Sequence, residues 1–165
     1  MNWKFRITVI FGAIFIFALG ATGVACAAPP TDLCSLLAPS QLEKTLGQPF
    51  GAPQKSKAPP AYGAQPWGVH CEYTSQKGPD VTVDFIAYED ASASEAKQTF
   101  DKLSVWFAPK SKPAIGDSAY IDASHAIHVL KGRVRYYISI DSGGTFTAAK
   151  EEQLKDLATS VAARI

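Results

Sequence analysis

The stretch VTVDFIAY, residues 81–88, is the clearest strand signal in the chain. Its apolar residues stand at alternate positions, which places them together on one face of an extended segment. Val69, Cys71 and Tyr73 alternate in the same way just upstream, and residues 77–80, KGPD, supply a turn between the two segments. The two segments therefore predict an antiparallel hairpin with one buried face.

The same alternation returns in the C-terminal half. Residues 118–122, 126–131 and 134–141 predict three more strands, and Lys131–Arg133 forms the turn of the last hairpin. In the last strand one face carries Val134, Tyr136, Ile138 and Ile140, and the other carries Arg135, Tyr137 and Ser139.

Three helices are predicted around these strands. A capping box at Ser40–Glu43 opens a short helix that ends at Gly47, and a second capping box at Ser92–Glu95 opens a longer amphipathic helix. Thr147 caps the last helix. The order α-β-β-α-β-β-β-α predicts an α+β domain, in which flanking helices pack on a twisted antiparallel sheet.

The first 27 residues have the three parts of a secretory signal peptide. Lys4 and Arg6 supply a cationic start, residues 7–19 are apolar apart from one threonine, and small residues follow. Residues 25–27, ACA, fit the A-x-A cleavage rule, so cleavage would leave residues 28–165 as a single mature domain. We therefore expect export to the periplasm or the extracellular space.

Two other fates of this segment stay open. Residues 23–26, GVAC, resemble a bacterial lipobox with Gly23 where leucine is usual, which makes Cys26 a candidate for lipidation. Extension of the apolar segment through the Ala/Gly stretch would approach the roughly 20 residues of a membrane-spanning helix and leave an uncleaved anchor. Membrane attachment is expected only through this N-terminal segment.

The chain has three cysteines, and cleavage and lipidation both reduce them to one pair. Cys26 is removed or carries lipid, which leaves Cys34 and Cys71 in an oxidising compartment. The expected outcome is a disulfide between them, and the alternative is two buried free thiols. Closing a loop of about 38 residues would stabilise the fold by roughly 4 kcal/mol in the chain-entropy model.

Charge and motifs limit the function classes. Removal of Lys4 and Arg6 with the signal peptide would change the net charge from +1 to −1, and a near-neutral chain is not expected to bind nucleic acid. Residues 141–144, DSGG, lack the glycine that precedes the nucleophile motif of trypsin-like proteases, and a strand-to-helix turn explains them. We interpret His125 and His128 as surface residues of a hairpin rather than as zinc ligands, because strand residues three apart point to opposite faces. We expect no metal and no cofactor, and catalysis is not favoured.

Residues 48–68 are so rich in Pro, Gly and Ala that they predict an irregular loop. Irregular segments of this length are uncommon in compact domains and are often functional or disordered. The candidate binding residues lie in this loop and in a similar Pro/Lys-rich linker downstream: Trp67, Tyr62, Lys55, Lys57, Lys110 and Lys112. They would form a basic, aromatic rim for an anionic partner. For Trp67 itself the sequence favours the other interpretation, in which the ring packs over the disulfide and caps the core.

Several short motifs resemble a broad group of bacterial envelope proteins. These are CSLL at 34–37, SQLEKTLG at 40–47, CEY at 71–73 and IGDSAY at 115–120. They look like those of secreted and lipoprotein-like proteins, many of them actinobacterial, that have two paired cysteines. The resemblance implies a fold similar to bacterial kinase sensor domains or to the PsbP-like fold. It also implies the Cys34–Cys71 pairing, and it offers no catalytic residue that could be transferred to this chain.

The sequence therefore favours an exported, non-enzymatic binding or interaction module whose partner is an envelope component or a protein. One alternative is a small envelope hydrolase with a site assembled by the fold, which a pocket lined by His125 or His128 beside a carboxylate would favour. The other is a structural accessory subunit, which a large exposed apolar patch would favour.

Overall fold

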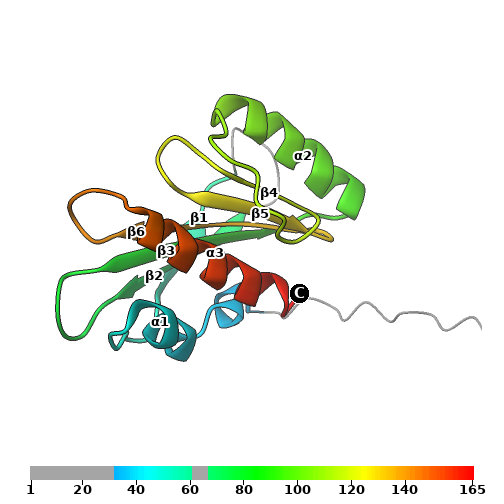
Figure 1. Cartoon of the computed structure of the whole chain (residues 1–165). Coiled ribbons are helices and arrows are strands. Elements are labelled where there is room, and N and C mark those ends of the chain that lie inside the picture. Colours follow the sequence, from blue (N-terminus) through cyan, green and yellow to red (C-terminus); the bar gives the residue numbers. More distant parts are fainter. Residues whose placement is uncertain (1–31, 61–66) are drawn as a thin grey trace, which may run out of the picture.

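Six antiparallel strands form one sheet in the order β1-β2-β3-β6-β5-β4, as Figure 1 shows. This computed structural model describes residues 32–60 and 67–165. The strands are β1 (Gln54–Ala58), β2 (Gly68–Thr74), β3 (Thr82–Glu89), β4 (Ser118–Ile121), β5 (Ile127–Lys131) and β6 (Val134–Asp141). The predicted hairpins are β2–β3 and β5–β6, and β3 pairs with β6 at the centre of the sheet.

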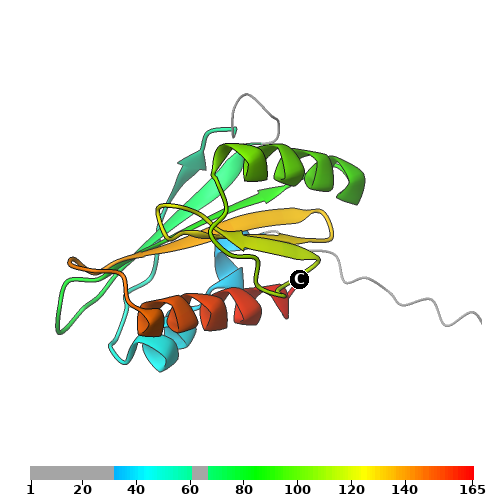
Figure 2. The ribbon, with the colours of Figure 1, turned by 45° about the horizontal axis from the view of Figure 1, so that its top comes forward.

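Helices lie on both faces of the sheet. The 3-10 helix η1 (Leu33–Leu36), α1 (Pro39–Leu46) and α3 (Ala148–Ala162) lie on one face, and α2 (Ala93–Trp106) lies on the other (Figures 1 and 2). We call these the α3 face and the α2 face. The arrangement confirms the predicted α+β fold.

Local capping explains where the helices begin. The side chains of Ser92 and Thr147 accept hydrogen bonds from the backbone amides of Glu95 (3.2 Å) and Lys150 (3.3 Å), which confirms both predicted caps. The cap of α1 differs from the prediction, because the helix already begins at Pro39, a residue whose fixed φ suits the first helical position.

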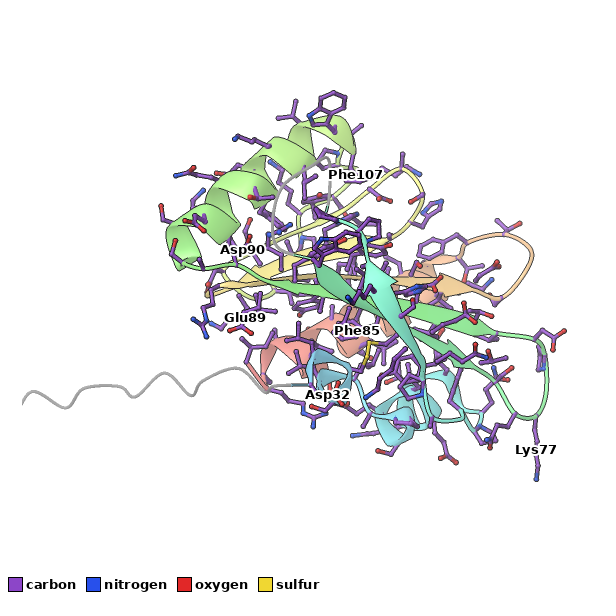
Figure 3. The ribbon with its side chains drawn as sticks, turned by 180° about the vertical axis from the view of Figure 1, so that it is seen from behind. Asp32, Lys77, Phe85, Glu89, Asp90 and Phe107 are labelled. Carbon is purple, nitrogen blue, oxygen red and sulfur yellow. A yellow bond between two sulfur atoms is a disulfide. The ribbon has the colours of Figure 1, made fainter. Side chains whose placement is uncertain are left out.

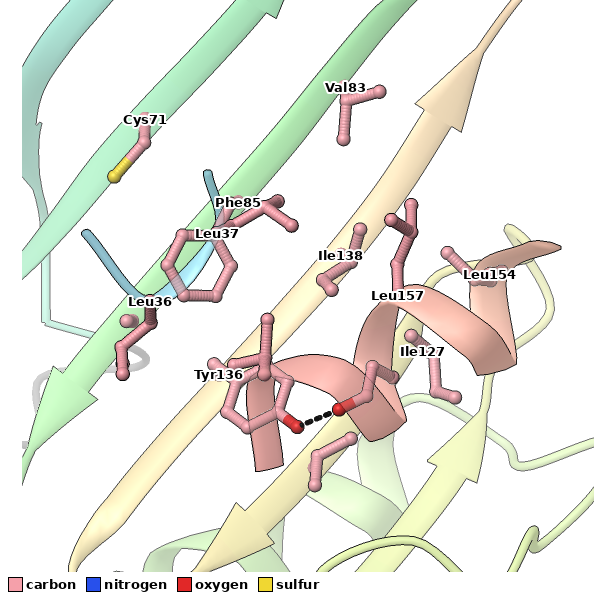
Figure 4. Packing of buried hydrophobic residues seen from close by; sticks show 14 of the residues in the cluster. Leu36, Leu37, Cys71, Val83, Phe85, Ile127, Tyr136, Ile138, Leu154 and Leu157 are labelled. Carbon is pink, nitrogen blue, oxygen red and sulfur yellow. Dashed lines mark hydrogen bonds between the residues drawn. The ribbon is translucent and has the colours of Figure 1, made fainter. Parts of the chain in front are cut away.

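The main core fills the space between the sheet and the helices of the α3 face (Figure 4). Phe85 and Ile138, directly opposed on β3 and β6, pack with Leu157 of α3, and all three side chains are fully buried. Each such burial stabilises the fold by roughly 1.5–3 kcal/mol. The Tyr136 hydroxyl donates a hydrogen bond of 2.6 Å to the carbonyl of Ala158, so this polar group of the core is satisfied.

The Cys34–Cys71 disulfide is present, as predicted, and ties η1 to β2. Its sulfurs appear as the yellow bond in Figure 3, on the same side of the sheet as Phe85. The buried Tyr73 hydroxyl lies within hydrogen-bond distance of the carbonyls of Cys34 and Leu37. The opening turn is therefore attached to β2 by both a covalent and a polar contact.

The predicted irregular loop at residues 48–68 is wrong in part, because β1 occupies Gln54–Ala58. Four of its five residues are exposed, so this edge strand has no apolar alternation that the sequence could reveal. The predicted signal peptide, Cys26 and Tyr62 lie outside the described residues. Among residues 32–60 and 67–165, no helix combines the length and the apolar content that are needed to cross a membrane.

Candidate functional site

One row of side chains crosses the whole sheet on the α2 face. Its members are paired from strand to strand: Ser56, His70, Ile86, Tyr137, His128 and Tyr120. Directly opposed residues of antiparallel strands point to the same face, so the six side chains share one surface. Because α2 packs mainly on β5 and β6, the helix covers the aromatic end of the row and leaves the β1–β3 end open (Figure 2).

A pocket of about 60 Å³ lies at the covered end, between α2 and the sheet. Phe100 and Leu103 line it from one face of the helix, and Phe107, which is labelled in Figure 3, lines it directly after the last helical residue. The strands contribute Tyr88, Tyr120, His128, Arg135, Tyr136 and Tyr137. The pocket is smaller than the roughly 150 Å³ cavity that holds a benzene molecule, so its size suits a branched aliphatic group or the end of an acyl chain.

One wall of the pocket is a stack of rings. His128 lies parallel to Tyr120 with 4.5 Å between ring centroids, and Phe107 and Tyr137 lie 4.8 and 5.3 Å from it. His128 is therefore buried, with 8% of its surface exposed, and the prediction of a surface hairpin histidine is wrong for this residue. α2 covers it, and the sequence contains no sign of that coverage.

His128 also has a buried carboxylate partner. Its Nε2 lies 2.9 Å from Oδ2 of Asp122, whose other oxygen accepts hydrogen bonds from the amides of Ser124 (2.8 Å) and Ala126 (3.0 Å). Burial opposes ionisation of Asp122, but the hydrogen bonds from His128, Ser124 and Ala126 outweigh it and lower its pKa to about 2. These contacts organise the β4–β5 turn, so the pair has a structural role.

The floor of the pocket is neutral because its charge is paired. Arg135 donates two hydrogen bonds to the Asp90 carboxylate, at 2.6 and 3.1 Å, and both side chains are almost fully buried. The guanidinium carbon also lies 4.9 Å from the ring centroid of Tyr88. Burial, with smaller effects from Tyr88, Asp84 and Asp122, raises the pKa of Tyr137 to about 12, so the phenol stays protonated at neutral pH.

The open end of the row is polar. His70 Nε2 lies 2.7 Å from Asp84 Oδ1, and Ser56 Oγ lies 3.5 Å from the other ring nitrogen. Glu72 is two residues beyond His70 on β2 and directly opposes Asp84 on β3. His70 and Asp84 have 28% and 33% of their side-chain surface exposed, so solvent reaches the cluster.

The residues predicted as one binding rim lie apart. Lys55 and Lys57 are exposed on β1, and Lys55 donates a 2.6 Å hydrogen bond to Asp32 on the α3 face. Lys110 and Lys112 lie in the linker before β4, where Lys110 donates to the carbonyl of Ala123. β1 and β4 are opposite edges of the sheet, five strand spacings or about 24 Å apart, so the two lysine pairs do not form a joint rim.

Trp67 lies immediately before β2 and has 57% of its surface exposed. It therefore does not cap the core over the disulfide, and a surface role for it stays a prediction.

Sequence reasoning did not identify the polar cluster or the pocket. His70 and Glu72 stand on one face of a predicted strand, and Asp84 stands on the strand predicted to pair with it, so a register for that hairpin would have brought them together. The pocket is different, because Phe100, Leu103 and Phe107 have the spacing of an ordinary buried helix face. The pocket exists because α2 lies at a certain position over the sheet, and the sequence does not specify that position.

No protein-family model matches the chain, and neither a curated protein nor a solved structure matches it. The resemblance to bacterial envelope proteins therefore stays a prediction.

Proposed function

We propose that the protein is an exported, non-enzymatic binding module of the cell envelope, which holds an apolar group of its partner in the pocket beside α2. The observation that carries the proposal is the pocket itself, which is lined by aromatic rings and has a charge-neutral floor. Small-molecule sites are mostly apolar concavities with a few polar groups that orient the ligand. Tyr137, as a protonated phenol, is the candidate for that polar group.

Export is supported by two features. The N-terminal segment has the order of charge, apolar run and small residues that is typical of a signal peptide. The Cys34–Cys71 disulfide is of the kind that persists in oxidising compartments.

A binding role is also supported by the residues around the pocket. None of the described residues that line it is a serine, cysteine, aspartate or glutamate. In the same turn of α2, Val105 and Trp106 are 81% and 72% exposed, which gives a partner an apolar surface beside the pocket. An envelope lipid or an apolar segment of a protein would fit this combination.

The test uses two tryptophan substitutions in α2. Leu103→Trp would fill the pocket, whereas Val105→Trp would add the same ring on the exposed side of the same helical turn. Short-chain alcohols from butanol to octanol are titrated into the mature protein while the NMR signals of Tyr88 and Tyr137 are followed. We expect shifts in the wild type and the Val105→Trp control and none in Leu103→Trp. Retention of envelope-fraction lipid or protein should follow the same order. Shifts that are absent from the wild type, or that persist in Leu103→Trp, would refute the proposal.

The hydrolase alternative has one observation in its favour, the Ser56–His70–Asp84 series on the open end of the row. Its order of hydroxyl, imidazole and carboxylate is that of a serine hydrolase triad. However, Ser56 is exposed on an edge strand, and 3.5 Å is the outer limit for a hydrogen bond that would activate it. Hydrolysis of p-nitrophenyl acetate that is lost in Ser56→Ala, but kept in Ser139→Ala on β6, would favour the enzyme over the binding module.

A further inference from the structure

We propose that His70, Glu72 and Asp84 bind a divalent transition-metal ion of the zinc class on the open end of the α2 face. One ligand atom from each of the three residues lies within 4.8 Å of the other two. Bonds of about 2.05 Å in a tetrahedral site place two ligand atoms about 3.4 Å apart. The 2.7 Å between His70 Nε2 and Asp84 Oδ1 is shorter than this value, so these two side chains would move slightly apart to admit an ion between them.

The backbone holds the three residues in a fixed relation. His70 and Glu72 are alternate residues of β2 and therefore share a face, and Asp84 of β3 is in register with Glu72. β3 is a central strand, paired with β2 on one side and β6 on the other. The ligands thus stand on two neighbouring, fully paired strands rather than on loops, and such sites keep their geometry well.

Electrostatics favours a cation at this point. Glu72 and Asp84 are directly opposed carboxylates, an arrangement that destabilises a sheet when nothing lies between them. A divalent ion would neutralise both. His70 Nδ1 faces Ser56 Oγ at 3.5 Å, so coordination through Nε2 would leave the second ring nitrogen free to donate to a hydroxyl, as metal-bound histidines usually do.

The ligand types indicate the class of metal. One imidazole with two carboxylates suits zinc and its neighbours in the first transition series, whereas magnesium and calcium prefer oxygen ligands alone. Three protein ligands also leave a fourth position of a tetrahedral site, and the partial exposure of His70 and Asp84 places that position toward solvent. A donor group of a partner could occupy it. The inference does not depend on the apolar pocket.

The experiment is a zinc titration of tag-free mature protein after treatment with a chelator. Isothermal calorimetry is expected to give one ion per chain with a dissociation constant below about 10 µM. Asp84→Asn and Glu72→Gln, which keep shape and remove charge, are each expected to weaken binding at least about tenfold. Asp80→Asn, in the β2–β3 turn, is the matched carboxylate control and should bind as the wild type does.

A second measurement distinguishes the loss of the metal site from a loss of the fold in the variants. Zinc is expected to raise the midpoint of thermal unfolding of the wild type and of Asp80→Asn, but not of Asp84→Asn, since an ion that binds only the native state stabilises it. Cobalt in place of zinc should give the visible absorption of an ordered site. A dissociation constant above about 10 µM, or binding that Asp84→Asn and Glu72→Gln leave unchanged, would overturn the inference.

Discussion

The buried ion pair between Arg135 and Asp90 allows a quantitative test of the fold. The two side chains retain 4% and 2% of their exposed surface and share two hydrogen bonds. Removal of one partner would leave the other charge desolvated and without its counter-ion. Experience with buried pairs places the cost at about 3–5 kcal/mol. We therefore expect Asp90→Ala to lower the free energy of unfolding by about 4 kcal/mol and Arg135→Met to lower it by a similar amount.

The double variant Asp90→Val with Arg135→Met separates a buried charge from lost packing. It removes both charges and keeps most of the apolar volume, so its stability should lie close to that of the wild type. The coupling energy from the cycle, with Asp90→Val as the matched single change, should then exceed about 2 kcal/mol. The exposed pair Lys97–Asp101 on α2 is the control, and its removal should change stability by less than about 1 kcal/mol.

Urea unfolding followed by circular dichroism measures these differences, provided that the slopes of the transitions stay equal among the variants. In thermal unfolding, 4 kcal/mol corresponds to a fall of roughly 15 °C for a domain of this size. Single changes that each cost less than about 1 kcal/mol would show that the pair is not desolvated as described. A double variant as unstable as the two singles combined would show that the charges themselves are not coupled.

Three further predictions concern stability. Replacement of Cys34 and Cys71 by alanine should lower the free energy of unfolding by roughly 4 kcal/mol, and urea unfolding of the variant beside the oxidised wild type checks this. The lowered pKa of Asp122, about 2 against 3.8 in the unfolded chain, should contribute about 2 kcal/mol that is present above pH 4 and lost as the pH falls toward 2. Asp122→Asn should remove this contribution and flatten stability between pH 4 and pH 2, whereas an unchanged acid profile would contradict it. Gly116→Ala should lower the midpoint of thermal unfolding of the protein more than Gly132→Ala does. Both glycines have a positive φ, so both changes strain the backbone. A Cβ at 116 would in addition lie 2.5 Å from the Leu130 carbonyl oxygen, whereas a Cβ at 132 would have nothing within 4 Å.

Local patterns were sufficient to predict most of the elements. The alternation in residues 81–88 and 134–141 placed Phe85 and Ile138 on the buried face, where the structure has both. Ser92 and Thr147 marked the starts of α2 and α3, because a capping hydroxyl acts within three residues of its own position. These patterns depend on residues that are close together in the chain, and for that reason they can be read without knowledge of the tertiary structure.

The features that escaped prediction depend on distant neighbours. β1 forms from QKSKA because β2 offers it hydrogen-bonding partners, not because its own residues favour a strand. His128 is buried because α2 and Phe107, about twenty or more residues upstream, lie over it, and its Nε2 lies within hydrogen-bond distance of Asp122. Lys55 and Lys110 occur in similar local sequences, yet the strand order places them at opposite edges of the sheet.

That strand order leaves β1 and β4 as the two edges of the sheet, and edge strands can promote aggregation. A sheet with free edges invites a second chain to add its own strand, which is the first step toward fibres. The edge strand β1 meets this hazard with two exposed lysines and with prolines at 53 and 59 on either side, while the other edge, β4, is only four residues long and carries a bridge from Ser111. We therefore expect Lys55 and Lys57 to limit edge-to-edge pairing between copies of the chain, whether or not they also contact a ligand.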